Sequence, residues 1–268
     1  MSRSTSWDAV LEKYARLKQP DKELPPSVLL LHDDKCMTIF DGYEKAKYHF
    51  LVLPRDPFIL STGSKIATQN LTSLQFLLSS KSCLQVLKAL EFQSNQVCDM
   101  IKDEMKKTFN CVWDVQIGFH AIESMRHVHL HVVSNDFVSD RLKNKKHYNS
   151  FHPKLGFFLH LSDVIRDVEN GIRNQRPTSY YESILKQPLV SHITNKEFPN
   201  IPKLKLHLQN EFERMIINAK SNGDQHVVAA SRTNKIEDNH TNKRKESSPN
   251  RTEPEVEDAR KRSKIESD

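Results

Sequence analysis

Three histidines alternate with aliphatic residues in the segment His127-Val-His129-Leu-His131-Val-Val. If this segment is a β-strand, alternate side chains share a face, so the three imidazoles project together and the aliphatic side chains pack on the opposite face. A neutral imidazole has one ring nitrogen that donates a hydrogen bond and one that accepts. Such a group can attack phosphorus, move a proton or bind zinc.

Three interpretations of this cluster are open from the residues alone. The first is a set of hydrogen-bonded core histidines, which is costly because each ring has two nitrogens that need partners. The second is a zinc site, although nothing in the sequence supplies the activating carboxylate that a hydrolytic zinc site usually has. The third is chemistry on a phosphate, in which one imidazole attacks phosphorus and its neighbours stabilise charge.

The elements that must position this cluster predict an α+β fold with helices and a mostly antiparallel sheet. Short apolar runs bounded by turn residues predict strands over residues 28–32, 36–40, 48–53, 112–119 and 127–133. Apolar residues at three- and four-residue spacing predict helices over residues 7–17, 71–105 with a break near 79–80, 161–169, and from about 202 onward.

The composition of the 268 residues disfavours membrane-spanning and secreted proteins. No stretch approaches the roughly 20 apolar residues that a membrane span needs, and the N-terminus lacks the apolar core of a secretory signal. The four cysteines (Cys36, Cys83, Cys98 and Cys111) show no paired spacing, which indicates reduced thiols.

Charge is unevenly placed along the chain, whose net charge is +6. Residues 222–268 contain ten Lys/Arg and ten Asp/Glu, so the positive excess lies in residues 1–221. Residues 141–160 contain five basic and no acidic residues, which is typical either of a solvated loop or of a phosphate-contacting surface. Residues 222–268 lack aromatic residues and are predicted to be disordered, with basic clusters at 243–245 and 260–264 that suit nuclear import.

The histidine segment resembles the signature of the histidine triad superfamily of nucleotide hydrolases and transferases. Residues 118–137, 142–151 and 45–54 are similar to the aprataxin branch of that superfamily, and the lysine-rich stretch after the triad distinguishes this branch. The resemblance extends from about Trp7 to about Phe212. It implies a histidine triad domain followed by a small helical module.

The resemblance also implies an activity. Aprataxins are DNA deadenylases of single-strand break repair, which hydrolyse the phosphoric anhydride of 5′-adenylated DNA, an abortive ligation product, to AMP and 5′-phosphate DNA. The implied nucleophile is His129, which forms an adenylyl-histidine that water hydrolyses, so the chemistry needs no cofactor. The implied partners are AMP and nicked or broken double-stranded DNA carrying 5′-AMP, with unidentified repair proteins and no membrane, and the implied location is the nucleus.

Two other functions stay open beside this one. A general nucleoside phosphoramidase or dinucleotide hydrolase of the same superfamily would not need the C-terminal module or the import-like tail. Nor would it need the basic run, by which we mean Lys143, Lys145 and Lys146. A non-catalytic DNA-end binder would not need an intact triad. We therefore expect the deadenylase.

The resemblance assigns roles to further residues of this sequence. The catalytic group around the nucleophile is implied to be His127, His131, His120 and His49. The nucleotide is implied to contact Asp41, Lys45 and Ser124. DNA is implied to contact Lys143, Lys145, Lys146 and His147, with Trp7 stacking on a terminal base pair.

The family usually ends in a zinc module with two cysteines, a histidine and a histidine or glutamate as ligands. Here these positions are Ser191, Thr194, His207 and Glu211, and no cysteine follows Cys111. Hydroxyls are poor zinc ligands compared with thiolates. Zinc is typical of the family, but we expect no tight zinc in this chain, even if the neighbouring His192 supplies a third ligand.

The sequence thus predicts three parts. A histidine triad catalytic domain spans residues 1–155, and a degenerate zinc-finger-like DNA-binding module spans 156–221. A disordered charged tail with nuclear-import-like basic clusters spans 222–268.

Overall fold

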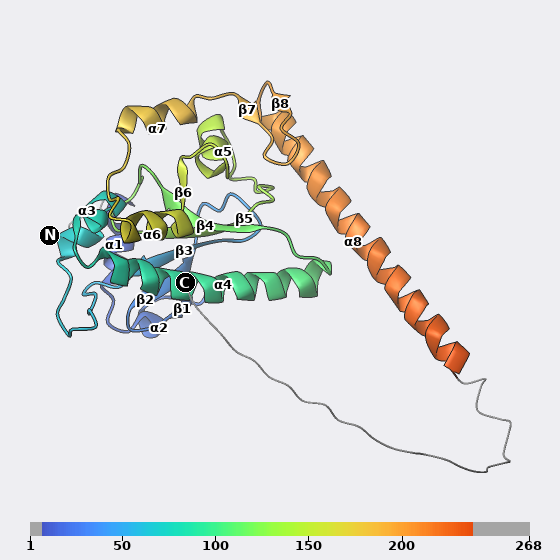
Figure 1. Ribbon diagram of the computed structural model, residues 1–268, viewed down its shortest axis with the longest axis horizontal. Helices are drawn as coiled ribbons and strands as arrows, with labels where there is room; N and C mark the ends of the chain where they lie inside the picture. Colours follow the sequence, from blue (N-terminus) through green and yellow to red (C-terminus); the bar gives the residue numbers. More distant parts are fainter. Residues whose placement is uncertain (1–6, 238–268) are drawn as a thin grey trace, which may run out of the picture. The chain divides into compact units, whose positions relative to one another are not determined.

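One antiparallel sheet of six strands organises the protein (Figure 1). The computed structural model describes the backbone of residues 7–237 and the side chains of residues 8–221. In sheet order β1-β2-β3-β5-β4-β6 every neighbouring pair is antiparallel. The strands are β1 (Leu29–His32), β2 (Cys36–Phe40), β3 (His49–Pro54), β4 (Val115–His120), β5 (Leu130–Ser134) and β6 (Phe158–His160). The predicted α+β class is confirmed.

The long helix α4 (Cys83–Phe109) lies along one face of the sheet, and α6 (Leu161–Glu169) packs against it (Figure 1). Leu130 and Val132 of β5 are fully buried on this face, as the alternation with the histidines predicts. The other helices are η1 (Trp7–Ala9), α1 (Val10–Ala15), α2 (Pro20–Glu23), η2 (Thr68–Leu71), α3 (Leu74–Ser79), α5 (Lys145–Phe151), α7 (Thr178–Leu185) and α8 (Ile201–Glu237).

The opposite face of the sheet is covered by two separate groups. Leu11 of α1 packs with Ile39 and Leu51 over the β2–β3 part of the sheet. Phe151 of α5 packs with Val133 over the β5 part. The histidines of β3 and β5 lie on this same face, because they alternate with the side chains that point at α4. The fold therefore leaves the histidines between α1 and α5.

Short-range signals in the sequence explain several element ends. The β1–β2 turn forms where Asp33 Oδ1 accepts hydrogen bonds from the backbone N–H groups of Lys35 and Cys36, both at 2.7 Å. Helix α6 ends at the predicted Asn170-Gly171 pair, where Gly171 has φ +80°. The helical region after residue 70 breaks near Ser79–Ser80 as predicted, into α3 and α4.

A small hairpin and a helix follow the sheet. Strands β7 (Leu189–Val190) and β8 (Glu197–Phe198) pair antiparallel, and α8 begins three residues later. Leu204 and Leu208 of α8 are fully buried in a cluster with Tyr148 and Phe151 of α5. The prediction that the helix near Pro202 packs through these two leucines is confirmed.

Two elements that follow the predicted boundary at residue 155 pack with the sheet. β6 pairs with β4, and α6 shares the core of α4, so both belong to the sheet domain. The described part of the chain up to Gly223 forms one compact unit. Helix α8 extends to Glu237, past the predicted start of the tail at 222. The basic clusters at 243–245 and 260–264 lie outside the described residues.

All four cysteines are free thiols, as predicted. Within residues 7–237, no helix combines the length and apolar character needed to cross a bilayer.

Candidate active site

His129 lies directly before β5 and is held by the backbone of its neighbour. Its Nδ1 is 2.8 Å from the carbonyl oxygen of His127, and a carbonyl only accepts, so Nδ1 carries the proton. The neutral ring therefore keeps its lone pair on Nε2. Burial lowers the pKa of His129, which favours this neutral form. His129 thus has the protonation state of a nucleophile.

His127 differs from the prediction that three imidazoles project together from one strand. β5 begins at Leu130, and His127 has φ +86°, a left-handed backbone that is uncommon outside glycine. This backbone turns its ring to the end of β3, where Nε2 donates to the carbonyl oxygen of Pro54 at 2.6 Å. Burial lowers the pKa of His127 to about 4, so the ring stays neutral. His127 positions His129 through its backbone carbonyl.

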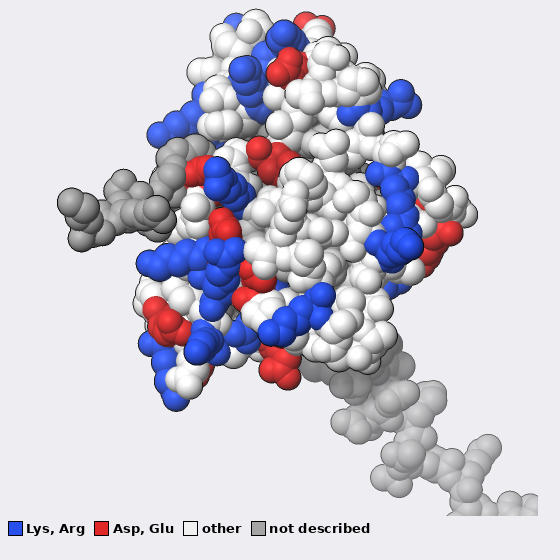
Figure 2. Space-filling view, turned by 90° about the vertical axis from the view of Figure 1, so that its left-hand side faces the viewer, with Lys and Arg blue, Asp and Glu red and all other residues white. Residues whose placement is uncertain are grey.

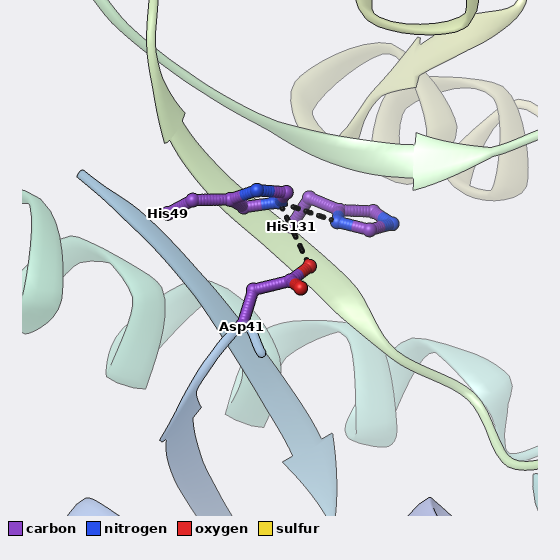
Figure 3. A group of neighbouring side chains, drawn as sticks. All are labelled: Asp41, His49 and His131. Carbon is purple, nitrogen blue, oxygen red and sulfur yellow. Dashed lines mark hydrogen bonds and ion pairs between the residues drawn. The ribbon is translucent and has the colours of Figure 1, made fainter. Parts of the chain in front are cut away.

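His49 and His131 face each other across the β3–β5 pair, with Asp41 beside them (Figure 3). His49 Nδ1 accepts from the backbone N–H of Lys45 at 3.2 Å, so the neutral ring carries its proton on Nε2. That Nε2 lies 2.9 Å from His131 Nδ1 and 3.3 Å from Asp41 Oδ2. His49 Nε2–H donates to His131 Nδ1, so Nδ1 of His131 is an acceptor. The proton of the neutral His131 ring is therefore on its Nε2, on the far side of the ring in Figure 3.

His120 completes a pocket of imidazoles. Its ring lies 4.5 Å from the ring of His131 and 4.3 Å from that of Phe151, measured between centroids. Among the side chains that the structure describes, His120 Nε2 and His131 Nε2 are buried and have no hydrogen-bond partner. Burial and the neighbouring imidazoles lower the pKa of both rings well below 6.5. Two neutral rings thus keep unpaired Nε2 atoms. The one on His131 carries a proton, for which a phosphate oxygen is a suitable acceptor.

Of the three residues predicted to contact the nucleotide, two lie beside the histidines and one lies in an exposed loop. Asp41 lies beside His49, and its Oδ1 accepts from the backbone N–H of Tyr43 at 2.7 Å. Lys45 is buried, its Nζ donates to the carbonyl oxygen of Tyr43, and burial lowers its pKa. Ser124 is exposed in the loop before β5, and its side chain makes no hydrogen bond within residues 8–221. The structure brings Asp41 and Lys45 to the histidines.

The basic run leads directly into α5. Lys143 and Lys146 are exposed, and Lys145 and His147 are half-buried. The helix starts where Asn144 Oδ1 accepts from the backbone N–H of His147 at 2.9 Å. Burial lowers the pKa of His147, and the positive charges of Lys45 and Lys143 add to this effect. Of the predicted DNA-contacting residues, only the side chain of Trp7 lies outside the described set.

Phe151 connects the basic run to the histidines, a role that the sequence did not reveal. It ends α5, and its ring meets those of His49, His120 and His131 at centroid distances of 5.1, 4.3 and 5.2 Å. Its apolar ring helps to exclude water from the site. A single phenylalanine after a basic run gives no sign of this contact.

Asp136 was also missed. This buried carboxylate accepts from the backbone N–H of Lys47 at 2.9 Å, from Trp113 Nε1 at 3.1 Å and from the backbone N–H of Val138 at 3.2 Å. It also accepts from the Ser134 hydroxyl. Asp136 therefore ties the loop that carries Lys45 to the end of β5. An Asn-Asp pair after a strand reads only as a turn in the sequence.

The four positions of the family's zinc module converge in space. His207 Nε2 lies 3.0 Å from Ser191 Oγ and 3.2 Å from Thr194 Oγ1, and His207 Nδ1 lies 3.8 Å from Glu211 Oε1. Two of the four are neutral hydroxyls, and a structural zinc site is built from thiolates and imidazoles. The residues present therefore do not fit a tightly held zinc ion.

His192 does not complete the zinc set. Its Nε2 donates to the carbonyl oxygen of Asn135 at 2.8 Å, and its Nδ1 lies 3.0 Å from Tyr148 Oη. Both ring nitrogens therefore contact the sheet domain. These contacts disfavour His192 as a third ligand.

Comparison with known proteins agrees with the fold. Residues 10–147 match the family model described as scavenger mRNA decapping enzyme C-term binding. Residues 154–214 match the model described as C2HE / C2H2 / C2HC zinc-binding finger. The sheet, its helices and the histidine cluster are those of the histidine triad class. The chain belongs to the aprataxin family of that superfamily.

Individual relatives show how far the similarity extends. Aprataxin from Danio rerio is 39% identical over 69% of this chain and 49% of the relative. An aprataxin-like protein from Saccharomyces cerevisiae is 29% identical over 77% of this chain and 96% of the relative. The chain spans about half the length of the vertebrate aprataxins it matches, 49% in Danio rerio and 52% in Gallus gallus. A crystal structure of the aprataxin ortholog Hnt3 in complex with DNA is 25% identical, with a TM-score of 0.60 over 81% of this chain and all of that chain.

Proposed function

We propose that this protein is a DNA deadenylase that hydrolyses 5′-adenylated DNA to AMP and 5′-phosphate DNA in single-strand break repair. The observation that carries the proposal is the His129 ring, whose Nδ1–H is bound to the His127 carbonyl and whose Nε2 keeps the lone pair. Around it stand buried neutral imidazoles, and a basic run lies directly after the pocket. An imidazole that can attack phosphorus, beside a surface that can bind a polyanion, suits an adenylated DNA end.

The first chemical step forms a covalent intermediate. His129 Nε2 attacks the phosphorus of the AMP moiety, and the anhydride P–O bond breaks. The electron pair goes to the bridging oxygen, which leaves as the 5′-phosphate of the DNA. A phosphate is a good leaving group, so the site needs no strong acid. The Nε2–H group of His131 can donate to an oxygen on which negative charge grows, and the unpaired Nε2 of His120 lies in the ring beside it.

The second step uses water. A water oxygen attacks the phosphorus of adenylyl-His129, the P–N bond breaks and its electron pair returns to Nε2. The products are AMP and a proton that leaves to solvent. His49 holds His131 in its Nε2–H form, because the Lys45 amide fixes the His49 tautomer. These steps use the imidazoles and water only, so no cofactor enters the chemistry.

Several observations support DNA as the group that the first step releases. Figure 2 shows a face on which Lys and Arg side chains gather in several groups around a broad uncharged area, with fewer acidic side chains. Lys143 and Lys146 are exposed at the start of α5, next to the pocket that Phe151 closes. The structural relative Hnt3 was solved in complex with DNA. Such a surface holds a phosphate backbone without reading sequence.

The cellular setting is part of the proposal. The basic clusters at 243–245 and 260–264 suit a bipartite nuclear-import signal, and single-strand break repair takes place on nuclear DNA. A fluorescent fusion of the full chain should accumulate in nuclei. Exchange of both clusters for alanine should release it to the cytoplasm.

One assay tests the proposed activity against its alternatives. Purified full chain is given adenylated nicked DNA, adenosine phosphoramidate and a diadenosine polyphosphate in parallel. We expect kcat/KM to be highest for the adenylated DNA, with AMP and a ligatable 5′-phosphate as products. Faster turnover of either small substrate would favour a general nucleotide hydrolase. DNA binding without turnover of any substrate would favour a DNA-end binder.

A further inference from the structure

The region matched by the zinc-finger model contains a closed set of hydrogen bonds at the family's metal position. Ser191 Oγ accepts from the backbone N–H groups of Ile193 and Thr194, both at 3.2 Å, and lies 3.0 Å from His207 Nε2. Ser191 is fully buried. Its hydroxyl has two acceptor sites and one proton, and these three contacts use all of them. Nothing remains on Ser191 for a metal ion.

The rest of the group lies around the His207 ring. Thr194 Oγ1 lies 3.2 Å from His207 Nε2, and Glu211 lies beside His207 Nδ1 at 3.8 Å. The ring of Phe198 stacks on His207 with centroids 4.7 Å apart. Glu211 also pairs with the Arg214 guanidinium. We call Ser191, Thr194, His207 and Glu211 the polar staple, because they join the β7–β8 hairpin to α8.

The staple supports the hairpin where it holds α5. Tyr148 Oη accepts from the backbone N–H of His192 at 2.9 Å, directly after Ser191. Asn149 Nδ2 donates to the carbonyl oxygen of Gln187 at 2.9 Å, just before β7. Both side chains are fully buried on α5, and Phe151 of the same helix contacts the imidazole pocket. The hairpin is therefore a brace for the helix that closes the site.

We propose that this chain has replaced the structural zinc of its family with the polar staple, and that the staple keeps the ligand geometry that zinc would need. The ligand atoms of a tetrahedral zinc site lie about 3.3 Å apart when their bonds are about 2.0 Å long. The distances from His207 Nε2 to the two hydroxyls, 3.0 and 3.2 Å, are close to that separation. Two thiols at positions 191 and 194 would then form a site of two thiolates and the His207 Nε2 atom. Glu211, which contacts His207 at Nδ1, would have to turn to become the fourth ligand.

The test compares metal binding by wild type and by S191C/T194C, both as full chains. After dialysis against zinc and then against metal-free buffer, we expect about one zinc per chain in S191C/T194C and well under one in wild type. Cobalt(II) should give thiolate charge-transfer bands and tetrahedral absorption in S191C/T194C only. The matched control is T178C/S183C, which puts two thiols at exposed positions of α7 without an imidazole, and should show neither.

Thermal unfolding tests the staple in the absence of metal. EDTA should leave the Tm of wild type unchanged and should lower that of zinc-loaded S191C/T194C. S191A should lower the Tm by on the order of 5 °C, because two buried N–H groups and His207 lose their partner. S150A removes a hydroxyl of similar size from α5, whose single bond is to the His147 carbonyl, and should cost less.

Three results would overturn the inference. One is stoichiometric zinc in wild type that H207A removes, which would mean that the hydroxyls ligate the metal. The second is no metal binding by a folded S191C/T194C, which would mean that the zinc geometry is lost. The third is an S191A Tm equal to that of wild type. Metal content and Tm do not depend on deadenylation, so these results are independent of the proposed activity.

Discussion

Nδ1 of His129 lies 2.8 Å from the carbonyl oxygen of His127, and this contact selects the ring nitrogen that is free to react. The acceptor is a backbone atom, so it is present whatever side chain stands at position 127. The His127 ring is bonded separately to the Pro54 carbonyl. Nucleophile and support can therefore be separated by mutation.

Substitutions at positions 129 and 127 should lower kcat by different factors. H129A removes the attacking atom and should lower kcat on adenylated DNA by at least about 10³-fold, with no adenylyl-enzyme. H127A keeps the carbonyl but loses the Pro54 anchor, so His129 shifts and kcat should fall by about 10²-fold. Rapid quench with labelled adenylate measures both. An intermediate trapped on H129A would contradict the assignment.

The pH dependence of the rate should reflect burial. An unperturbed histidine is half protonated near pH 6.5, and a protonated ring cannot attack phosphorus. Burial lowers the pKa of His129, so the neutral ring should persist below pH 6.5 and kcat/KM should fall only at lower pH. A small adenylate substrate avoids effects of pH on DNA binding. An acid limb centred at or above 6.5 would contradict this prediction.

The free energy of unfolding should also fall as the pH is lowered. Burial lowers the pKa of His49 and of His127 to about 4, whereas both titrate near 6.5 in the unfolded chain. Between these values the unfolded chain binds more protons, so the free energy of unfolding falls as pH falls from 6.5 towards 4. Each ring contributes up to about 1.4 kcal/mol per pH unit in that interval. Urea unfolding at pH 7.5 and 5.5 measures the loss, and equal values would contradict it.

The elements that the sequence predicted best have local causes. β2 was predicted with its observed ends because the Asp33 turn and Asp41 bound a short apolar run. Helix α6 was predicted because its apolar stripe ends at Asn170-Gly171. His49, His120, His129 and His131 lie close together. The alternation along the strand predicted this for His129 and His131, and the resemblance implied it for His49 and His120.

The features that were missed depend on contacts between distant residues. β6 has three residues and forms only because β4 offers an edge, which no local pattern shows. α5 lies in a basic stretch that predicts a loop, and it is stabilised by Tyr148 and Asn149 against the hairpin. The left-handed backbone of His127 depends on the Pro54 carbonyl, 73 positions away.

The basic run should act on DNA binding more than on chemistry. K143A/K145A/K146A should weaken binding of nicked DNA and reduce the salt slope by about one per lost phosphate contact. Turnover of a small adenylate should change little. The matched control is K102A/K106A/K107A, which removes three exposed lysines from α4 and should leave the salt slope unchanged. Equal losses on both substrates would show that the run is structural.

Gly118 sets the spacing between β4 and β6, and so the position of Phe158 beside the histidines. It pairs with His131 on one side and His160 on the other. A Cβ at this position would lie 2.5 Å from Phe158 Cε1 and would collide with the carbonyl oxygen of Leu159. The strand cannot move away without losing its pairing.

G118A should therefore lower the free energy of unfolding by about 2–3 kcal/mol. It should also lower turnover, because the Phe158 ring packs against Phe151, 6.0 Å away between centroids, which in turn contacts His131. The matched control is G42A, since a Cβ there meets nothing within 4 Å and the backbone is not left-handed. Chemical denaturation of both variants at pH 7.5 measures the difference. If G118A is as stable as G42A, β6 does not fix the wall of the imidazole pocket.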